Sequence, residues 1–217
     1  MLTSVICAED NPSALFVRLK GILLYMKTTK TKILVEAAIM IALATVLCYI
    51  RIIKLPWGGS VTLLSMLPII IFSIKHGVKN GMFASFVFSL IQFGQGVMDG
   101  LFAWGLTPAM LIACIVLDYI GAYSVIGVAG AFRNKGFAGW VSGTILAVFL
   151  RYVFHVLSGV VIWHSIGSIW EGFSTDNEVL YSLVYNGAYM LPEMIFTLIG
   201  AIALLKIPQT KRIIAQE

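Results

Sequence analysis

The chain has 217 residues, of which 59% are hydrophobic and 12% charged, and its formal net charge is +5. Soluble domains contain about 45–50% apolar and about 25% charged residues, so this composition indicates an integral membrane protein. The sequence lacks the alternating apolar strands of an outer-membrane barrel, which leaves the all-α class.

Residues 1–30 precede the apolar part of the chain and lack the order of charges, apolar run and small residues that marks a signal peptide. They are predicted to be an N-terminal extension, either an overcalled start with Met26 as the natural one or an amphipathic segment on the membrane surface. Residues 31–217 are predicted to form a single membrane domain, because no repeat or linker interrupts them.

Six apolar segments follow, at residues 33–53, 60–75, 80–98, 106–132, 138–163 and 181–205. Because a membrane-spanning helix needs about 20 mostly apolar residues, six spans are predicted. Most basic residues lie on one side of these spans, and they are Arg18, Lys20, Lys27, Lys30, Lys32, Lys75, Lys79, Arg133, Lys135, Lys206, Lys211 and Arg212. Both termini are therefore expected to be cytoplasmic, and the charge indicates topology rather than nucleic-acid binding.

Several sequence features of enzymes and metal proteins are missing. There is no phosphate loop for ATP hydrolysis, and Ser142 and Ser158 lack the context of a serine nucleophile. The three cysteines are odd in number and imply neither a disulfide framework nor a metal site. We expect a non-enzymatic protein without cofactor or metal.

A row of four unusual residues lies within the fifth span. Arg151, His155, Gly159 and Trp163 are each four residues apart and therefore share one side of a helix. Inserting an ionisable side chain at the centre of a membrane span costs at least ~2.5–3.5 kcal/mol of free energy. A residue of this kind within a span therefore points to a function. Asp118 in the fourth span is predicted to pair with Arg151, and such a balanced carboxylate can also receive a cationic ligand.

Other polar and aromatic residues gather near the predicted outer surface. They are Trp57 in the first outer loop and Tyr181, Tyr185, Asn186 and Tyr189 in the sixth span. Aromatic residues are common in interfacial belts, but a buried amide such as Asn186 needs partners. Together with Asp118 and His155, this set suits a small, flat, partly cationic heteroaromatic molecule.

Three segments resemble the thiamine-specific S component of energy-coupling factor transporters: LDYIGAYSVIGVAGAFRNK, RYVFHVLSGVVIW and YSLVYNGAYMLPEMI. The resemblance covers residues 31–206 and implies the S-component fold, with a thiamine pocket facing outward from the bacterial cytoplasmic membrane. It assigns thiamine binding to Trp57, Asp118, Tyr119, Arg151, His155, Gly159, Trp163, Tyr181 and Asn186.

The resemblance also implies partners in the lipid bilayer. Ala38 and Ala42 would contact a transmembrane coupling subunit, and two separate ATPase subunits would hydrolyse ATP. Two departures stand out: family members often carry glutamate at the position of Asp118, and tryptophan where this chain has Phe88.

Rival interpretations keep the membrane fold and change the role. One is an S component for another vitamin, such as riboflavin or biotin. Another is a stand-alone proton-coupled transporter that uses Asp118, His155 and Glu193 as a relay. An intramembrane hydrolase would need a defined nucleophile, and the sequence offers none.

Overall fold

The computed structural model describes residues 30–55 and 59–215. Contacts divide the chain into two units, Met1–Glu36 and Ala37–Glu217. Helix α2 (Lys30–Cys48) begins in the first unit and continues into the second. The predicted extension and the alternative start at Met26 fall on residues 1–29, outside the described part. All packing below concerns Ala37–Glu217.

In the described residues, four helical stretches have the length and apolar composition needed to cross a membrane. They are Lys30–Cys48, Leu67–Met98, Pro108–Trp163 and Glu178–Lys206. The chain is thus mostly helical, as predicted. The second and third stretches are each interrupted by one glycine.

These two glycines have backbone angles that other residues rarely adopt. Gly77 lies inside α3 (Leu67–Met98) with φ +80°, and Gly136 follows a 3₁₀ segment with φ +64°. Without a Cβ, glycine reaches this region at little steric cost. The Arg133 side chain packs on Gly77 and donates to the Lys75 carbonyl at 3.0 Å. Both breaks fall in gaps between the predicted apolar segments.

The third stretch consists of several helical pieces in series. These are α4 (Pro108–Cys114), the π-helical η3 (Ile115–Gly121), α5 (Ala122–Ser124), the 3₁₀ segment η4 (Val125–Lys135), α6 (Gly136–Ser158) and the π-helical η5 (Gly159–Trp163). Thr107 caps α4 by accepting from the Met110 N–H, and Pro108 suits the first turn because its fixed φ is helical. π-Helical turns are frequent at functional sites, and both lie in segments that carry predicted site residues.

Two antiparallel hairpins correct the all-α prediction. Strand β1 (Arg51–Lys54) pairs with β2 (Ser60–Thr62), and β3 (Gly167–Trp170) pairs with β4 (Phe173–Thr175). The first predicted span at 33–53 is therefore too long, since α2 ends at Cys48, and the second span at 60–75 begins as a strand. A short apolar run does not distinguish strand from helix by composition alone.

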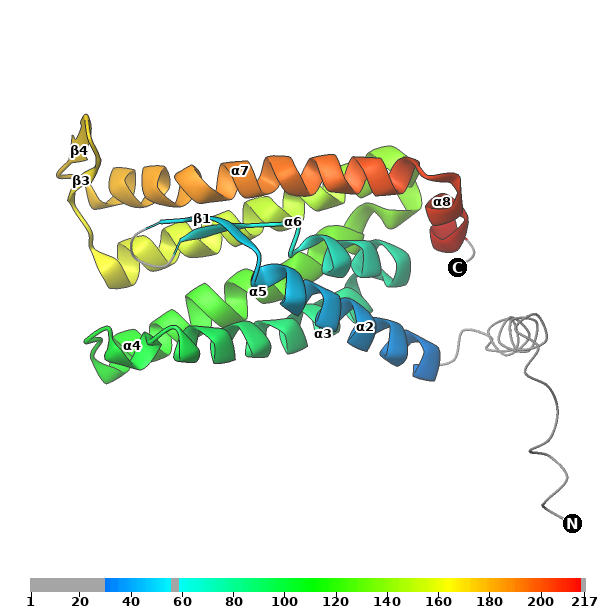
Figure 1. Ribbon diagram of the computed structural model, residues 1–217, viewed down its shortest axis with the longest axis horizontal. Helices are drawn as coiled ribbons and strands as arrows, with labels where there is room; N and C mark the ends of the chain where they lie inside the picture. The colour runs from blue at the N-terminus through cyan, green and yellow to red at the C-terminus, as the bar shows by residue number, and fades with distance from the viewer. Residues whose placement is uncertain (1–29, 56–58, 216–217) are drawn as a thin grey trace, which may run out of the picture. The chain divides into compact units, whose positions relative to one another are not determined.

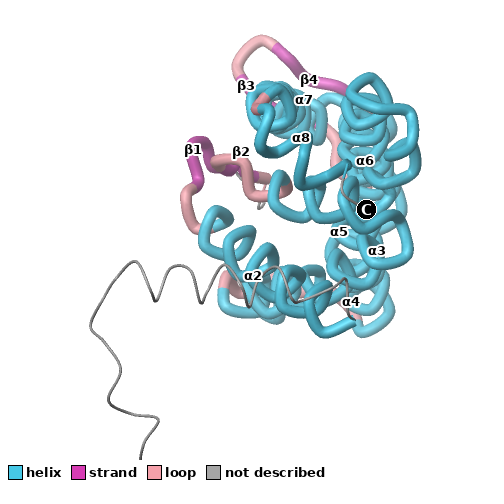
Figure 2. Tube along the Cα trace, turned by 90° about the vertical axis from the view of Figure 1, so that its right-hand side faces the viewer, coloured by secondary structure: helices cyan, strands magenta, loops and turns pink. Residues whose placement is uncertain are grey.

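Helices α6 and α7 (Glu178–Lys206) lie side by side (Figure 1). The β3–β4 hairpin lies at the N-terminal end of α7, and α8 (Pro208–Ala215) lies at its other end. Strand β2 contacts α7, away from the β3–β4 hairpin (Figure 2). A short 3₁₀ turn, η2 (Leu101–Ala103), precedes α4.

Small residues bring the helices together closely. A Cβ on Gly127 of η4 would overlap the backbone of Gly81 and Met82 in α3, and one on Gly143 of α6 would overlap the Ala129 carbonyl oxygen. Close backbone approach at small residues is the usual packing of membrane helices. These close contacts hold α3, η4 and α6 together, and these elements position the site.

Candidate functional site

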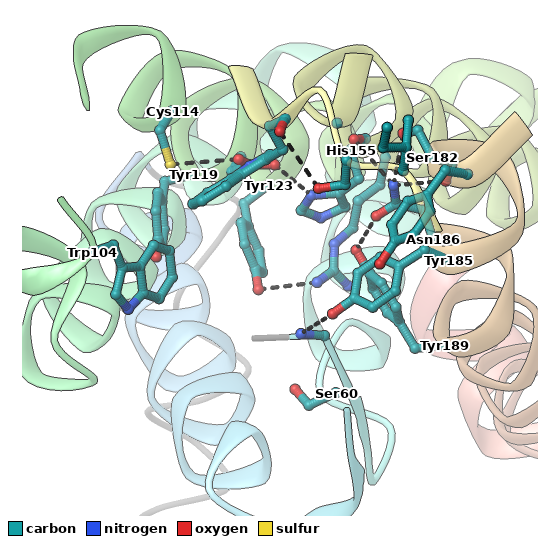
Figure 3. Close-up of a pocket in the computed structure, with 18 of the residues that line it drawn as sticks. Ser60, Trp104, Cys114, Tyr119, Tyr123, His155, Ser182, Tyr185, Asn186 and Tyr189 are labelled. Carbon is teal, nitrogen blue, oxygen red and sulfur yellow. Dashed lines mark hydrogen bonds and ion pairs between the residues drawn. The ribbon is translucent and has the colours of Figure 1, made fainter. Parts of the chain in front are cut away.

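One cavity of about 450 Å³ lies among β2, η3, α6, η5 and α7 (Figure 3). It is lined by Gly59, Ser60, Trp104, Cys114, Asp118, Tyr119, Tyr123, Arg151, His155, Gly159, Trp163, Ser165, Ile166, Ser168, Tyr181, Ser182, Tyr185, Asn186 and Tyr189. This volume is typical of a small-molecule site. The structure thus brings every predicted thiamine-site residue except Trp57 to one cavity, and Trp57 lies outside the described residues.

The Asp118 carboxylate is held by three neighbours. His155 donates its Nδ1–H to Oδ1 at 2.9 Å, the Ser158 hydroxyl donates to Oδ2, and the Cys114 thiol lies 3.4 Å from Oδ2. The side chain is 18% exposed, so its charge faces the cavity from a largely dry site. Ser158 was not predicted as a site residue.

The predicted ion pair between Asp118 and Arg151 is wrong. Arg151 instead donates to the Tyr123 hydroxyl at 2.9 Å and to Met66 Sδ at 3.1 Å. Its guanidinium carbon lies 4.3 Å from the centroid of the Tyr123 ring, a cation–π arrangement. His155 lies one turn beyond Arg151 on α6, and its ring reaches Asp118 first.

His155 leaves one ring nitrogen without a hydrogen-bond partner among the described residues. Because Nδ1–H donates to Asp118, the neutral ring carries its lone pair on Nε2. Nε2 is buried and has no hydrogen-bond partner among the residues that the structure describes.

Aromatic rings form opposite walls. Trp104 and Tyr119 lie on one side of the cavity and Tyr185 and Tyr189 on the other (Figure 3). Trp104 packs edge-on against Trp163 with centroids 5.6 Å apart, so the two tryptophans act as one surface. Trp104 lies in the loop between the predicted spans 80–98 and 106–132 and was not predicted as a site residue. In the sequence, its aromatic side chain is the only property that indicates such a role.

Asn186 joins α7 to α6 beside the cavity. Its Nδ2 donates to the Ser182 carbonyl at 2.9 Å and to the His155 carbonyl at 3.3 Å. Its Oδ1 accepts from the Tyr189 hydroxyl at 2.7 Å. The amide is thereby satisfied within the protein, and it orients Tyr189 and the backbone that carries His155.

Gly159 lines the cavity and also allows α6 and α7 to pack closely. A Cβ there would overlap the Ser182 side chain on α7, whose hydroxyl donates to the Val156 carbonyl at 2.9 Å. Phe88, which is fully buried, packs edge-on against Tyr123 at 5.7 Å and is not part of the cavity lining. It supports the wall from behind.

A second cavity of about 510 Å³ adjoins the first and shares with it Ser60, Trp104, Tyr119, Tyr123, Arg151 and Trp163. An ion pair between Arg51 and Asp99, with Nη2 and Oδ2 2.6 Å apart, lies in its wall. The hydrogen bond that Arg51 donates to Asp99 raises the pKa of Arg51, so this guanidinium is charged at any physiological pH.

The predicted coupling residues lie on the outer face of α2. Ala38 and Ala42 are exposed, whereas Ala37 and Ala44 are buried. Within residues 30–55 and 59–215, no three His, Cys, Asp or Glu side chains gather as they would around a metal ion.

Comparisons with known proteins agree on one family. The family described as "Thiamine transporter protein" matches residues 34–213. The chain is 33% identical to the thiamine transporter ThiT of Bacillus subtilis (strain 168), over 75% of this chain and 84% of that protein. It is 24% identical to ThiT of Lacticaseibacillus paracasei, over 77% of this chain and 83% of that protein.

A solved structure of ThiT from Listeria monocytogenes has a similar fold. The TM-score is 0.66 at 27% sequence identity, and the match covers 83% of this chain and 97% of that one. The likeness therefore spans nearly the whole of the solved chain.

Proposed function

Because the chain belongs to the thiamine transporter family, we propose that it binds thiamine from outside the cell and delivers it for uptake. It is a multi-pass protein of the cytoplasmic membrane and acts as a thiamine-binding S component. The observation that carries the proposal is the cavity in which the Asp118–His155 pair faces walls of tryptophan and tyrosine.

The cavity complements both rings of thiamine. The thiazolium ring is a cation, and among the described residues no lysine or arginine lies within ion-pair distance of the Asp118 carboxylate. The aminopyrimidine is neutral and can form hydrogen bonds with the polar side chains that line the cavity. Tryptophan and tyrosine faces add stacking and cation–π contacts of ~0.5–2 kcal/mol each.

Arg151 and Asn186 have supporting roles in this proposal. Arg151 orients Tyr123 through its hydrogen bond and its stacking on the ring. Asn186 orients Tyr189 and ties α7 to α6. Tyr119, Trp163 and Tyr181 supply apolar ring surface at the cavity.

The proposed topology has six crossings with both termini in the cytoplasm. The breaks at Gly77 and Gly136 support it, because each divides a long helical stretch where basic residues cluster. Arg133 and Lys135 precede the second break, and Lys75 and Lys79 flank the first. Basic residues of this kind stay on the cytoplasmic side.

ATP-driven uptake would need partners. We infer that a transmembrane coupling subunit docks on α2 at Ala38 and Ala42, which are small and exposed. Two ATPase subunits would hydrolyse ATP, since the chain has no phosphate loop of its own.

Direct binding tests the function. Purified protein titrated with thiamine should show saturable quenching of tryptophan fluorescence, because Trp104 and Trp163 line the cavity. Calorimetry with thiamine, riboflavin and biotin should give a tight complex with thiamine only, without ATP. Binding of riboflavin or biotin in place of thiamine would defeat the proposal.

A further inference from the structure

We propose that Glu193 is a positioning residue for ligand binding, which holds strand β2 so that Gly59 and Ser60 form one wall of the cavity. The inference rests on the proposed function, since thiamine is taken as the ligand. Glu193 is not among the described residues that line either cavity, whereas its hydrogen-bond partner Thr62 belongs to the strand that carries Ser60.

Both carboxylate oxygens of Glu193 accept hydrogen bonds from β2. Thr62 donates its backbone N–H to Oε2 and its hydroxyl to Oε1, each at 2.6 Å. The Ser65 hydroxyl lies 2.6 Å from the Thr62 hydroxyl and 3.4 Å from Oε1. Glu193 is 2% exposed and Thr62 8%, so these bonds are shielded from water, which strengthens them.

The carboxylate completes the backbone bonding of a very short strand. Strand β2 has three residues and pairs only with β1 in its two-stranded sheet. An unpaired buried N–H is as costly as a lost hydrogen bond, and the Thr62 N–H finds its acceptor on α7 instead of on another strand. A two-stranded hairpin is marginal by itself, so this anchor decides where β2 lies.

The same face of α7 holds β2 at a second place. Tyr185, Tyr189 and Glu193 are four residues apart and share one side of the helix. The Gly59 N–H donates to the Tyr185 hydroxyl at 3.3 Å, close to Ser60 (Figure 3), and a Cβ on Gly59 would lie 2.8 Å from the Tyr189 ring. Glu193 thus fixes one end of the strand whose other end forms the cavity wall.

The substitution Glu193→Gln tests the inference. Glu193→Gln keeps the shape of the side chain, but its NH₂ group cannot accept the bond that Thr62 donates. Thiamine should dissociate about 10-fold faster with little change in association, because mutations of one site act mostly on dissociation. In hydrogen–deuterium exchange of the ligand-free protein, the peptide covering residues 59–65 should exchange faster while α6 does not.

Matched variants separate this role from general damage. Thr197 lies one turn further on α7, is fully buried, and its hydroxyl has no hydrogen-bond partner among the described residues, so Thr197→Val should behave as wild type. Thr62→Ser keeps both donors and should also behave as wild type. Thr62→Val loses one donor and should speed dissociation about threefold, with little further loss when combined with Glu193→Gln, because neighbours in one network are not additive.

Other outcomes overturn the inference. An unchanged dissociation rate in folded Glu193→Gln, or faster exchange spread equally over α6 and α7, would show that Glu193 does not position β2. Normal binding with lost uptake would assign Glu193 to proton transfer instead. If Glu193→Gln does not fold, Thr62→Val against Thr62→Ser decides. If wild type fails to bind thiamine, the proposed function fails, and the exchange comparison still tests the anchor.

Discussion

In the proposed function, Asp118 is the residue whose charge would most directly separate thiamine from neutral ligands. Its carboxylate faces the cavity and is held by His155 and Ser158, and it makes no ion pair with Arg151 within the described chain. The negative charge is therefore available to a cationic ring. His155 and Ser158 keep the carboxylate in place without cancelling its charge, provided that the imidazole is neutral.

Asp118→Asn removes this charge with little change in shape. We expect thiamine binding to weaken by roughly 1.5–3 kcal/mol, the scale of a hydrogen bond to a charged group, or roughly 10- to 150-fold in affinity. A thiamine analogue with an uncharged ring in place of the thiazolium should lose much less. Calorimetry with both ligands measures the difference, and equal losses would mean that Asp118 only orients His155.

Gly159→Ala tests the close contact between α6 and α7. The added methyl group would overlap Ser182, and overpacking of this kind costs about 1–3 kcal/mol. We expect a lower melting temperature and weaker thiamine binding. Gly187→Ala is the matched control, because the only neighbour of its Cβ is Leu191 at 4.0 Å, and it should be neutral or stabilising. Equal effects of the two substitutions would contradict the packing role of Gly159.

At the level of elements, one exposed ion pair joins the end of η5 to the start of α7. His164 Nδ1 lies 2.8 Å from Glu178 Oε2, and both side chains are about half exposed. Asn177 caps α7 by accepting from the Leu180 N–H at 3.0 Å, and Glu178 in the first turn suits the positive end of the helix dipole. The pair thus brackets the β3–β4 hairpin; Ser168 of β3 and the preceding Ser165 and Ile166 line the cavity.

This pair predicts a pH dependence. The hydrogen bond to Glu178 raises the pKa of His164 above the ordinary histidine value of about 6.5. A raised folded-state pKa stabilises the protein fully below that ordinary value, and the contribution disappears as the pH rises through the raised pKa. The difference in melting temperature between wild type and His164→Gln should therefore shrink as the pH rises from below about 6.5 through the raised pKa of His164.

Asp176→Asn is the control for this titration. It removes an acid from the same outer segment and leaves the partner of His164 in place. Its melting temperature should follow that of wild type across the range. A wild-type advantage over His164→Gln that grows towards high pH would contradict the ion pair.

For the whole molecule, binding and uptake should be separable. Ala38→Trp and Ala42→Trp add bulk to the exposed face of α2, at the proposed contact with a coupling subunit. Radiolabelled thiamine uptake by cells should fall to background, whereas thiamine binding by the purified variants should stay at the wild-type level. Leu43→Trp, at a lipid-facing position that is 48% exposed, should support normal uptake. Loss of binding in the alanine variants would place these residues in the fold instead.

The sequence by itself determined the class of the protein, the apolar segments and the face of the fifth span. Those properties depend on composition and on helical periodicity, which are local. The spacing of Arg151, His155, Gly159 and Trp163 predicted one shared side, and all four line the cavity. Gly77 and Gly136 fall between predicted segments, where the helices break.

Only the tertiary structure decided which side chains meet across helices. Asp118 pairs with His155 and not with Arg151, and Glu193 anchors Thr62 from 131 positions away in the chain. Such partners depend on the rotation and relative height of neighbouring helices. Close glycine contacts and the π-helical segments η3 and η5 set those quantities, and a pattern within one helix carries no information about the distance to the next.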